Sequence, residues 1–418
     1  YGTNVSLISA EETVKRFPLC DVDMIQGAMW DPDAGLVVPR SQAVAGDLVD
    51  EAAETGKLQV FAYTPAIKIL VEHGRVCGVE THRGRIMSDK VVVSVGIWGP
   101  LLADQVGSKL PMVPLEHPLM FCGPYEELSG TGAVIVYPLF RDQGNSGYFR
   151  DTGDPATTEG GKIEWGYYET NNPVLVTAND IAEPGESRMS PSMRELSLEQ
   201  VLEPMEKAMA LVPLLGELGY EDRRSFNGLL SVTADGGSLI GEAPEISGLW
   251  FAEAVWVKDG PGVGKVVADW MTKGSPEYDP YGIDIARFYP EQKQDDYVFG
   301  RCGEIAKKVY TPAVHPREPF ETGRQLFKSP FYEREVALGG YFMEAAGWER
   351  AHGYAANEPT LLAKYRDQIP QRMNEWDSRH FWEVSNAEQL ALSDDVGMVN
   401  LSHFAIYDID GQSAEPLL

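Results

Sequence analysis

Apolar and polar positions along the chain alternate with glycine-rich breaks in a pattern that predicts a mixed strand and helix protein. The most continuous part lies between Phe226 and Trp270. It predicts a strand, an Asp-Gly-Gly turn at residues 235–237, a short strand, a strand over Leu249–Val257 and a helix over Gly262–Trp270. The Leu249–Val257 run is mostly apolar and does not alternate, which is typical of a strand covered on both faces.

The Gly262–Trp270 helix begins within the run Gly-Pro-Gly-Val-Gly at residues 260–264. The free N–H groups of such a helix start are suited to binding an anion or an electron-rich ring. The same spacing of glycines also occurs where a helix only packs tightly, and the sequence leaves both interpretations open. A P-loop is excluded, because Asp259 stands where that motif needs glycine and Val266 where it needs Ser or Thr. No acidic residue of a dinucleotide fingerprint is evident further on.

The N-terminal part predicts a half-Rossmann crossover, in which a buried strand, a glycine and a helix follow one another. The strand is Lys90–Val95, Gly96 begins the turn, and the helix lies near Leu101–Val106. The end of such a strand faces a ligand. Earlier residues predict a strand over Val5–Ile8, a helix over Gln42–Glu54 with Ser41 as N-cap, a strand over Leu58–Tyr63, and a hairpin of Ala66–Glu72 and Arg75–Glu80 turned at His73-Gly74.

After Lys109 the periodicity changes to short strands, which predicts an antiparallel sheet inserted into the first fold. A helix follows, begun by a capping box at Ser197–Gln200 and kinked at Pro204, before the chain returns to the first domain from Phe226. Beyond Gly274 the chain is charged and rich in loops, and a third region contains two long polar helical stretches. The predicted strands of the inserted sheet are Leu115–Phe121, Val134–Leu139, Gly147–Arg150 and Ile163–Tyr168.

Length, charge and cysteine content exclude several classes of protein. A chain of 418 residues is longer than a single hydrophobic core usually supports, so we expect more than one domain. The 35 basic and 63 acidic residues give a net charge of -28, which opposes binding to nucleic acid or to an anionic membrane. No apolar run is long enough to span a bilayer, and no signal peptide is evident. The four separated cysteines indicate reduced thiols, and we therefore expect a cytoplasmic protein.

The two ends of the chain predict an excerpt of a longer polypeptide. Tyr1 replaces a starting methionine, and the first predicted strand begins almost at once. Phe404–Ile409 with Asp410-Gly411 predicts the start of a hairpin that has no second strand. We expect the excerpt by itself to be inactive.

Two residues of the inserted sheet are candidates for proton chemistry. His117 can take or hold a proton near neutral pH, although a structural histidine fits its sequence context as well. Tyr148 offers a hydroxyl, and the alternative is an amphipathic core tyrosine. The seven histidines are scattered, so no metal site is expected. A Gly-x-Ser-x-Gly elbow is missing, which argues against a serine hydrolase. From the residues alone, the chain is an α/β ligand-binding protein with an inserted sheet.

An ordered series of motifs resembles the flavin-dependent dimethylglycine oxidase, dimethylglycine dehydrogenase and sarcosine dehydrogenase family. The series begins with S-V-T-A-D-G-G-S-L-I-G-E and F-A-E-A-V-W-V inside Phe226–Trp270 and continues through D-I-A-R-F at residues 284–288. K-S-P-F at 328–331 and A-G-W-E-R at 346–350 follow, and the series ends at Gly397–Phe404. The likeness covers nearly the whole chain, so it is more specific than any single motif.

The resemblance implies an α/β (α+β) architecture in three parts. Residues 1–271 would be an FAD-binding Rossmann-like domain that lacks its N-terminal part and contains the inserted antiparallel substrate sheet at about 108–225. Residues 272–322 would be a central connecting domain, and residues 323–418 the start of a folate-binding aminomethyltransferase domain. The implied activity is oxidation of an N-methylated amino acid by hydride transfer to FAD, with the one-carbon unit passed to tetrahydrofolate. The implied partner is a small methylated amine, and a homo-oligomer is possible on this basis.

The resemblance also assigns roles to individual residues. The family's active-site histidine and tyrosine fall on His117 and Tyr148. The implied cofactor-binding positions are Ala66, Gly96, Trp98, Tyr148, Val255, Trp256, Val257 and Lys258.

Three departures from the family pattern leave alternatives open. The N-terminal Gly-x-Gly-x-x-Gly and most of the folate domain are missing, Lys258-Asp259-Gly260 replaces a small hydroxyl residue followed by histidine, and Pro118-Leu119 is atypical after His117. These changes put the substrate in doubt more than the class of reaction. The alternative function is a folate-dependent aminomethyltransferase or one-carbon carrier with a degenerate flavin half.

Overall fold

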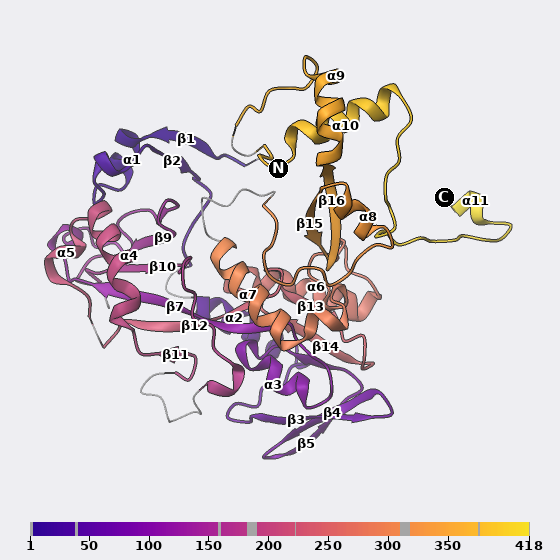
Figure 1. Cartoon of the computed structure of the whole chain (residues 1–418). Coiled ribbons are helices and arrows are strands. Elements are labelled where there is room, and N and C mark those ends of the chain that lie inside the picture. Colours follow the sequence, from indigo (N-terminus) through magenta and orange to yellow (C-terminus); the bar gives the residue numbers. More distant parts are fainter. Residues whose placement is uncertain are drawn as a thin grey trace. The chain divides into compact units, whose positions relative to one another are not determined.

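The computed structural model describes residues 3–37, 41–157, 160–181, 190–221, 223–309, 318–374 and 377–417. The chain divides into two compact units, Tyr1–Pro312 and Ala313–Leu418. Both contain strands and helices, so the α/β class predicted from the sequence is confirmed (Figure 1). In the part of the chain that the structure describes, no helix has the length and apolar character needed to cross a bilayer.

Two strands of a small sheet in the first unit lead into the predicted strand-to-helix crossovers. Its order is β13 (Leu239–Glu242), β14 (Leu249–Glu253) and β6 (Val91–Val93), and β14 runs parallel to β6. The 3-10 helix η2 (Gly96–Trp98) and helix α3 (Gly99–Asp104) follow β6. The 3-10 helix η5 (Val257–Asp259) and helix α6 (Gly260–Lys273) follow β14. Both crossovers thus open at the carboxyl end of a parallel strand, where α/β sheets bind ligands.

Strand β14 is shorter than the predicted Leu249–Val257. It ends at Glu253 because Ala254 has a φ of 52°, which lies in the left-handed region that breaks a ladder. The predicted cofactor positions Val255–Lys258 therefore lie in a loop and in η5, after the strand.

The inserted sheet has six strands in the order β11 (Met193–Arg194), β12 (Phe226–Thr233), β7 (Met112–Cys122), β10 (Ile163–Tyr167), β9 (Gly147–Asp151) and β8 (Phe140–Asp142). Figure 1 shows β7 and β12 side by side. The two strands pair antiparallel from Met112↔Thr233 to Leu119↔Phe226. Strand β12 follows the predicted end of the inserted sheet at residue 225 and is also a member of this sheet. The chain therefore leaves the sheet only after Thr233.

The two faces of the six-stranded sheet differ in burial. Side chains alternate along each strand, so Phe149 and Trp165 point to one face while Tyr148 and Gly166 belong to the other. Phe149 and Trp165 are 1% and 2% exposed and lie in a core that includes Val201 and Leu211 of helix α4 (Leu198–Leu211). Because this face is buried, the opposite face is the one available for a site.

Two predicted strands are wrong. Residues 58–63 form no strand, and Val60, Phe61 and Tyr63 are exposed there, with Tyr63 at a φ of 51°. Residues 134–139 form a loop because the N–H groups of Val136 and Tyr137 donate to the carboxylate of Asp151, each at 2.8 Å, and not to another strand.

Two predicted local motifs are also wrong. Ser197 is the N-cap of α4, but its side chain makes no capping hydrogen bond. Residues 404–409 form no strand.

Some of the remaining elements of the first unit are predicted from the sequence, namely the strand near residues 6–9, the helix at 41–54 and the hairpin, although the helix already includes Ser41, the predicted N-cap. The other elements are not predicted, and helix α7 lies in the region beyond Gly274 that the sequence predicts to be rich in loops. The hairpin turned at His73-Gly74 is present, and a third strand extends it. Helix α7, which follows the small sheet, packs against β12 and β7. These elements are β1 (Ser6–Ser9), α1 (Ala10–Arg16), β2 (Gly27–Trp30), α2 (Ser41–Glu54), β3 (Ala66–Glu72), β4 (Arg75–Thr81), β5 (Gly84–Met87), α5 (Leu215–Leu218) and α7 (Asp295–Val309).

The second unit is built on a two-stranded sheet, β15 (Gly340–Ala345) with β16 (Trp348–Tyr354). The carboxylate of Glu349, whose side chain is 0% exposed, pairs with Arg324 and accepts from the N–H of Gln325. The helices of this unit are α8 (Tyr332–Ala337), α9 (Ala363–Tyr365), α10 (Trp382–Asp394) and α11 (Ala414–Leu417).

Candidate active site

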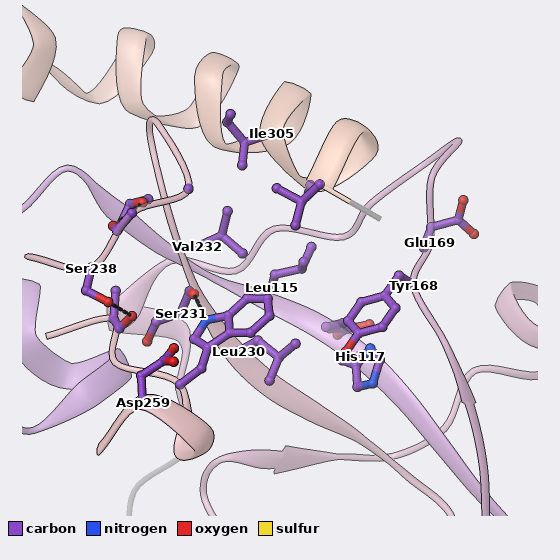
Figure 2. Close-up of a pocket in the computed structure, with 18 of the residues that line it drawn as sticks. Leu115, His117, Tyr168, Glu169, Leu230, Ser231, Val232, Ser238, Asp259 and Ile305 are labelled. Carbon is purple, nitrogen blue, oxygen red and sulfur yellow. Dashed lines mark hydrogen bonds between the residues drawn. The ribbon is translucent and has the colours of Figure 1, made fainter. Parts of the chain in front are cut away.

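A cavity of about 170 Å³ lies in the first unit beside the free face of the six-stranded sheet. Strands β7 and β12, the turn at 236–238, the loop after β14 and helix α7 line it. Figure 2 shows His117 and Tyr168 close together on one side, with Leu115, Leu230 and Val232 between them and Ile305 of α7. The cavity thus has a polar aromatic side and an aliphatic side.

His117 and Tyr148, the two predicted catalytic residues, are brought together by the sheet. His117 Nε2 and Tyr148 Oη share a hydrogen bond of 2.8 Å, whose direction depends on the histidine tautomer. The Tyr168 ring lies against the His117 ring with 4.5 Å between centroids. His117 and Tyr168 line the cavity. Tyr148 is not part of the lining and contacts His117 through the hydrogen bond. Tyr148 is therefore positioned to act on the cavity through His117.

Burial sets the protonation of this pair. Desolvation first, and the nearby positive charge of Arg141 second, lower the pKa of His117 from 6.5 to about 4. Burial, with the neighbouring Tyr168 and Glu164, raises the pKa of Tyr148 above its usual range. The imidazole is therefore neutral and the phenol protonated at neutral pH. The Arg141 guanidinium lies 5.2 Å from the centroid of the Tyr168 ring, on which His117 also packs.

Two of the predicted cofactor positions line the same cavity. The indole N–H of Trp256 donates to the carbonyl oxygen of Ser231 at 3.1 Å, which fixes the loop after β14 to strand β12. The ammonium of Lys258 lies 2.6 Å from the carboxylate of Asp259, and its side chain is exposed. Val257 is 72% exposed. Ala66 begins β3 in a separate three-stranded sheet and is not in the cavity lining.

Several glycines at the carboxyl ends of β6 and β14 border open space. A Cβ built on any of Gly96, Gly260, Gly262 and Gly264 would meet no described atom within 4 Å. The last three lie in the first turns of α6, whose N-terminus carries a partial positive charge. Trp98, in η2, is also partly exposed.

Glu253, the last residue of β14, is a buried carboxyl group next to this space. Its Oε1 accepts from the N–H of Val95 at 2.8 Å, and among the described residues nothing hydrogen-bonds Oε2. Burial raises the pKa of Glu253 to about 8. A buried carboxyl with an unpartnered oxygen indicates a group that a ligand or another part of the polypeptide would meet.

Sequence reasoning missed three of these residues. The sequence predicts Tyr168 only as the end of a strand, and its i, i+2 relation to Gly166 on one strand face is the signal that points to this position. Arg141 and Glu253 had no local signal, because each acts on residues far away in the sequence.

The fold defines a mixed α/β protein with a candidate ligand site at the carboxyl ends of parallel strands and a half-buried His–Tyr pair on an antiparallel sheet. Residues 1–270 match the family described as FAD dependent oxidoreductase, and residues 273–329 match the FAD dependent oxidoreductase central domain. The chain therefore belongs to the FAD dependent oxidoreductase family.

Several curated relatives align with nearly the whole chain. It is 28% identical over 417 residues to 4-methylaminobutanoate oxidase (formaldehyde-forming) of Paenarthrobacter nicotinovorans, covering 99% of this chain and 46% of the relative. It is 29% identical over 374 residues to human mitochondrial sarcosine dehydrogenase, covering 87% and 38%. It is 25% identical over 421 residues to the mouse mitochondrial pyruvate dehydrogenase phosphatase regulatory subunit, covering 100% and 45%. The chain thus spans about half the length of these relatives or less.

The fold is also similar to that of a solved structure, L-proline dehydrogenase from P. horikoshii. The TM-score is 0.54 at 22% sequence identity, over 68% of this chain and 69% of that chain. This likeness confirms the fold. The division at residues 271 and 322 and the folate domain stay predictions.

The described residues fit one side of the family's cofactor. The open glycines of α6 leave room for a flat ring or a phosphate, and the helix start favours electron-rich groups. Gly96, Trp98 and the loop containing Trp256 and Lys258 would hold FAD at the carboxyl ends of β6 and β14. The unpartnered Oε2 of Glu253 supplies one polar group beside that space.

Proposed function

We propose that the protein oxidises a small N-methylated amino acid with FAD as the electron acceptor in the first step. The flavin supplies the acceptor for a hydride from the carbon next to the amine nitrogen, which leaves the substrate as an iminium ion. The observation that carries the proposal is the neutral His117 at the cavity wall, hydrogen-bonded to Tyr148. Two relatives named for oxidation of a methylamino acid support the substrate class.

The residues of the cavity act on the protonation of the amine. Loss of a hydride requires the nitrogen lone pair, so the amine must be bound without its extra proton. The burial and the Arg141 charge that hold His117 neutral also disfavour an ammonium ion beside it. The neutral imidazole then orients the amine by a hydrogen bond, and Tyr148 fixes the imidazole from behind.

The aliphatic side of the cavity orients the rest of the substrate. Leu115, Leu230 and Ile305 exclude water from the space beside His117. We propose dimethylglycine, sarcosine or a longer methylamino acid as the substrate. We also propose that the one-carbon unit passes to tetrahydrofolate, which rests only on the resemblance of residues 397–404 to the opening of a folate domain.

The test is an anaerobic absorption spectrum of the purified full-length protein before and after addition of dimethylglycine, sarcosine or 4-methylaminobutanoate. We expect a flavin band that bleaches with at least one of them. A flavin band that none of these amines bleaches would reject this substrate class. A protein that cannot be loaded with FAD would reject the oxidation itself.

A folate-dependent aminomethyltransferase or one-carbon carrier with a degenerate flavin half is the second candidate. Two observations favour a loss of flavin chemistry, namely Lys258-Asp259-Gly260 after β14 and a relative named as a regulatory subunit. This candidate predicts a colourless protein that binds tetrahydrofolate, measured by equilibrium dialysis.

A further inference from the structure

The hydrogen bond between His117 and Tyr148 crosses an intervening strand. His117 lies on β7 and Tyr148 on β9, and β10 runs between them. The register pairs Gly166 of β10 with Leu119 of β7 on one side and with Tyr148 on the other. Gly166 therefore lies between Leu119 and Tyr148, and His117 is two residues from Leu119 on the same face of β7.

At this crossing point β10 has no side chain. A Cβ built on Gly166 would lie 2.3 Å from Tyr148 Oη and 2.4 Å from Tyr148 Cζ. Both distances are far shorter than a carbon atom can approach without displacing its neighbour. The Tyr148 phenol thus lies over the backbone of Gly166, in the space that any other residue would fill.

Backbone geometry does not account for this glycine. The φ of Gly166 lies outside the left-handed region, so other residues could adopt its conformation. A glycine inside a strand weakens the strand and often marks a close approach of another group. Here the group that approaches is the phenol of Tyr148.

We propose that Gly166 is a positioning residue, whose missing side chain lets Tyr148 reach across β10 and hydrogen-bond His117. The effect of Gly166 on the reaction rate rests on the proposed function, whereas its steric effect on the position of Tyr148 does not. Gly166 touches neither substrate nor cofactor in this proposal and acts only through Tyr148.

The experiment compares Gly166→Ala with Gly147→Ala in the purified protein. Gly147 is also a buried strand glycine of this sheet, next to Tyr148, but a Cβ there would be 3.6 Å from its nearest neighbour, Trp165 Nε1, which is ordinary contact. Crystal structures of both variants give the distance from His117 Nε2 to Tyr148 Oη. We expect it to exceed about 3.5 Å in Gly166→Ala, so that no hydrogen bond remains, and to stay near 2.8 Å in Gly147→Ala.

A double-mutant cycle with Tyr148→Ala separates positioning from a general effect on the strand. Tyr148→Ala removes the three atoms nearest to a methyl group at position 166, so we expect Tyr148→Ala and Tyr148→Ala/Gly166→Ala to have the same Tm and the same rate of flavin reduction. In the wild-type background, Gly166→Ala should lower that rate to the level of Tyr148→Ala, by roughly 10²-fold.

The outcomes are distinct. An intact His117–Tyr148 bond in Gly166→Ala, or an equal loss of Tm in both backgrounds, would overturn the proposal. If no methylamine reduces the wild-type flavin, the proposed function fails, but the crystal structures and the Tm cycle still decide the role of Gly166.

Discussion

His117 is surrounded by groups that keep it uncharged. It packs on Tyr168, hydrogen-bonds Tyr148, lies near the Arg141 charge and is half-buried in the sheet face. A desolvated neutral base of this kind suits a reaction that needs an unprotonated amine. The neighbours of His117 therefore keep the imidazole neutral at neutral pH.

Replacing Tyr148 with phenylalanine should slow flavin reduction by an N-methylated amine roughly 10²-fold, because the phenol that orients His117 loses its hydroxyl. The measurement is stopped-flow absorbance under anaerobic conditions. Tyr167→Phe is the matched control, since the Tyr167 hydroxyl donates to the carbonyl oxygen of Gln200 on the core side of the same sheet. Equal rates in Tyr148→Phe and Tyr167→Phe would contradict the role of Tyr148.

Replacing His117 with glutamine should make stability less sensitive to acid. The folded pKa of His117, about 4, is below its ordinary 6.5, so the unfolded chain binds the proton first. The contribution of His117 to the stability of the wild-type protein is fully present above about pH 6.5 and is lost as the pH falls toward 4. Urea unfolding at pH 7 and pH 4.5 should show a smaller loss in His117→Gln than in wild type. An equal loss in both proteins would mean that His117 is not held neutral.

At the scale of elements, two strand-to-helix crossovers end side by side. Strand β6 leads through Gly96 into α3, and β14 leads through the Trp256 loop into α6. Glu253 links the two crossovers, because its carboxyl group at the end of β14 accepts a hydrogen bond from the N–H of Val95 after β6. The open glycines of α6 thus stand beside a fixed edge of the sheet.

Replacing Gly262 with leucine should lower the FAD content of the purified protein at least tenfold and leave the Tm of the FAD-free protein unchanged. The leucine side chain enters the space where the cofactor would lie, and no described atom is within 4 Å of its Cβ. Flavin absorbance per mole of protein gives the content. Gly46→Leu in α2, also a helix glycine with open space, should keep its flavin. Full flavin in Gly262→Leu would exclude this helix start from the cofactor site.

At the scale of the molecule, the chain forms two units with separate buried interiors. Trp165 lies in the core of the first unit, and Glu349 is a buried carboxylate of the second. Two such units need not unfold in one step.

Differential scanning calorimetry should resolve the two units. Trp165→Ala should destabilise the first unit by about 3–5 kcal/mol through the cavity it leaves. Glu349→Ala should destabilise the second by about 3 kcal/mol, because Arg324 loses its partner. Each variant should move a different transition, and one shared transition for both would show that the units unfold together.

The sequence by itself determined several of the local elements and the class of the protein. Glycine and turn residues placed the 73–74 hairpin and both strand-to-helix crossovers, because backbone freedom is a local property. The resemblance of ordered motifs pointed to the flavin family, which the family match then established. It also singled out His117 and Tyr148 before their contact was known.

Only the tertiary structure decided how these pieces combine. Strand order placed β10 between the strands of His117 and Tyr148, and register placed Gly166 beside Tyr148. No local pattern encodes which strand lies between two others. The strand predicted at 134–139 failed for the same reason, because its N–H groups bind the distant carboxylate of Asp151. Glu253 and Val95 meet across 158 positions of sequence. Long-range pairing and burial, which depend on the whole fold, determine these contacts and the proton chemistry that follows from them.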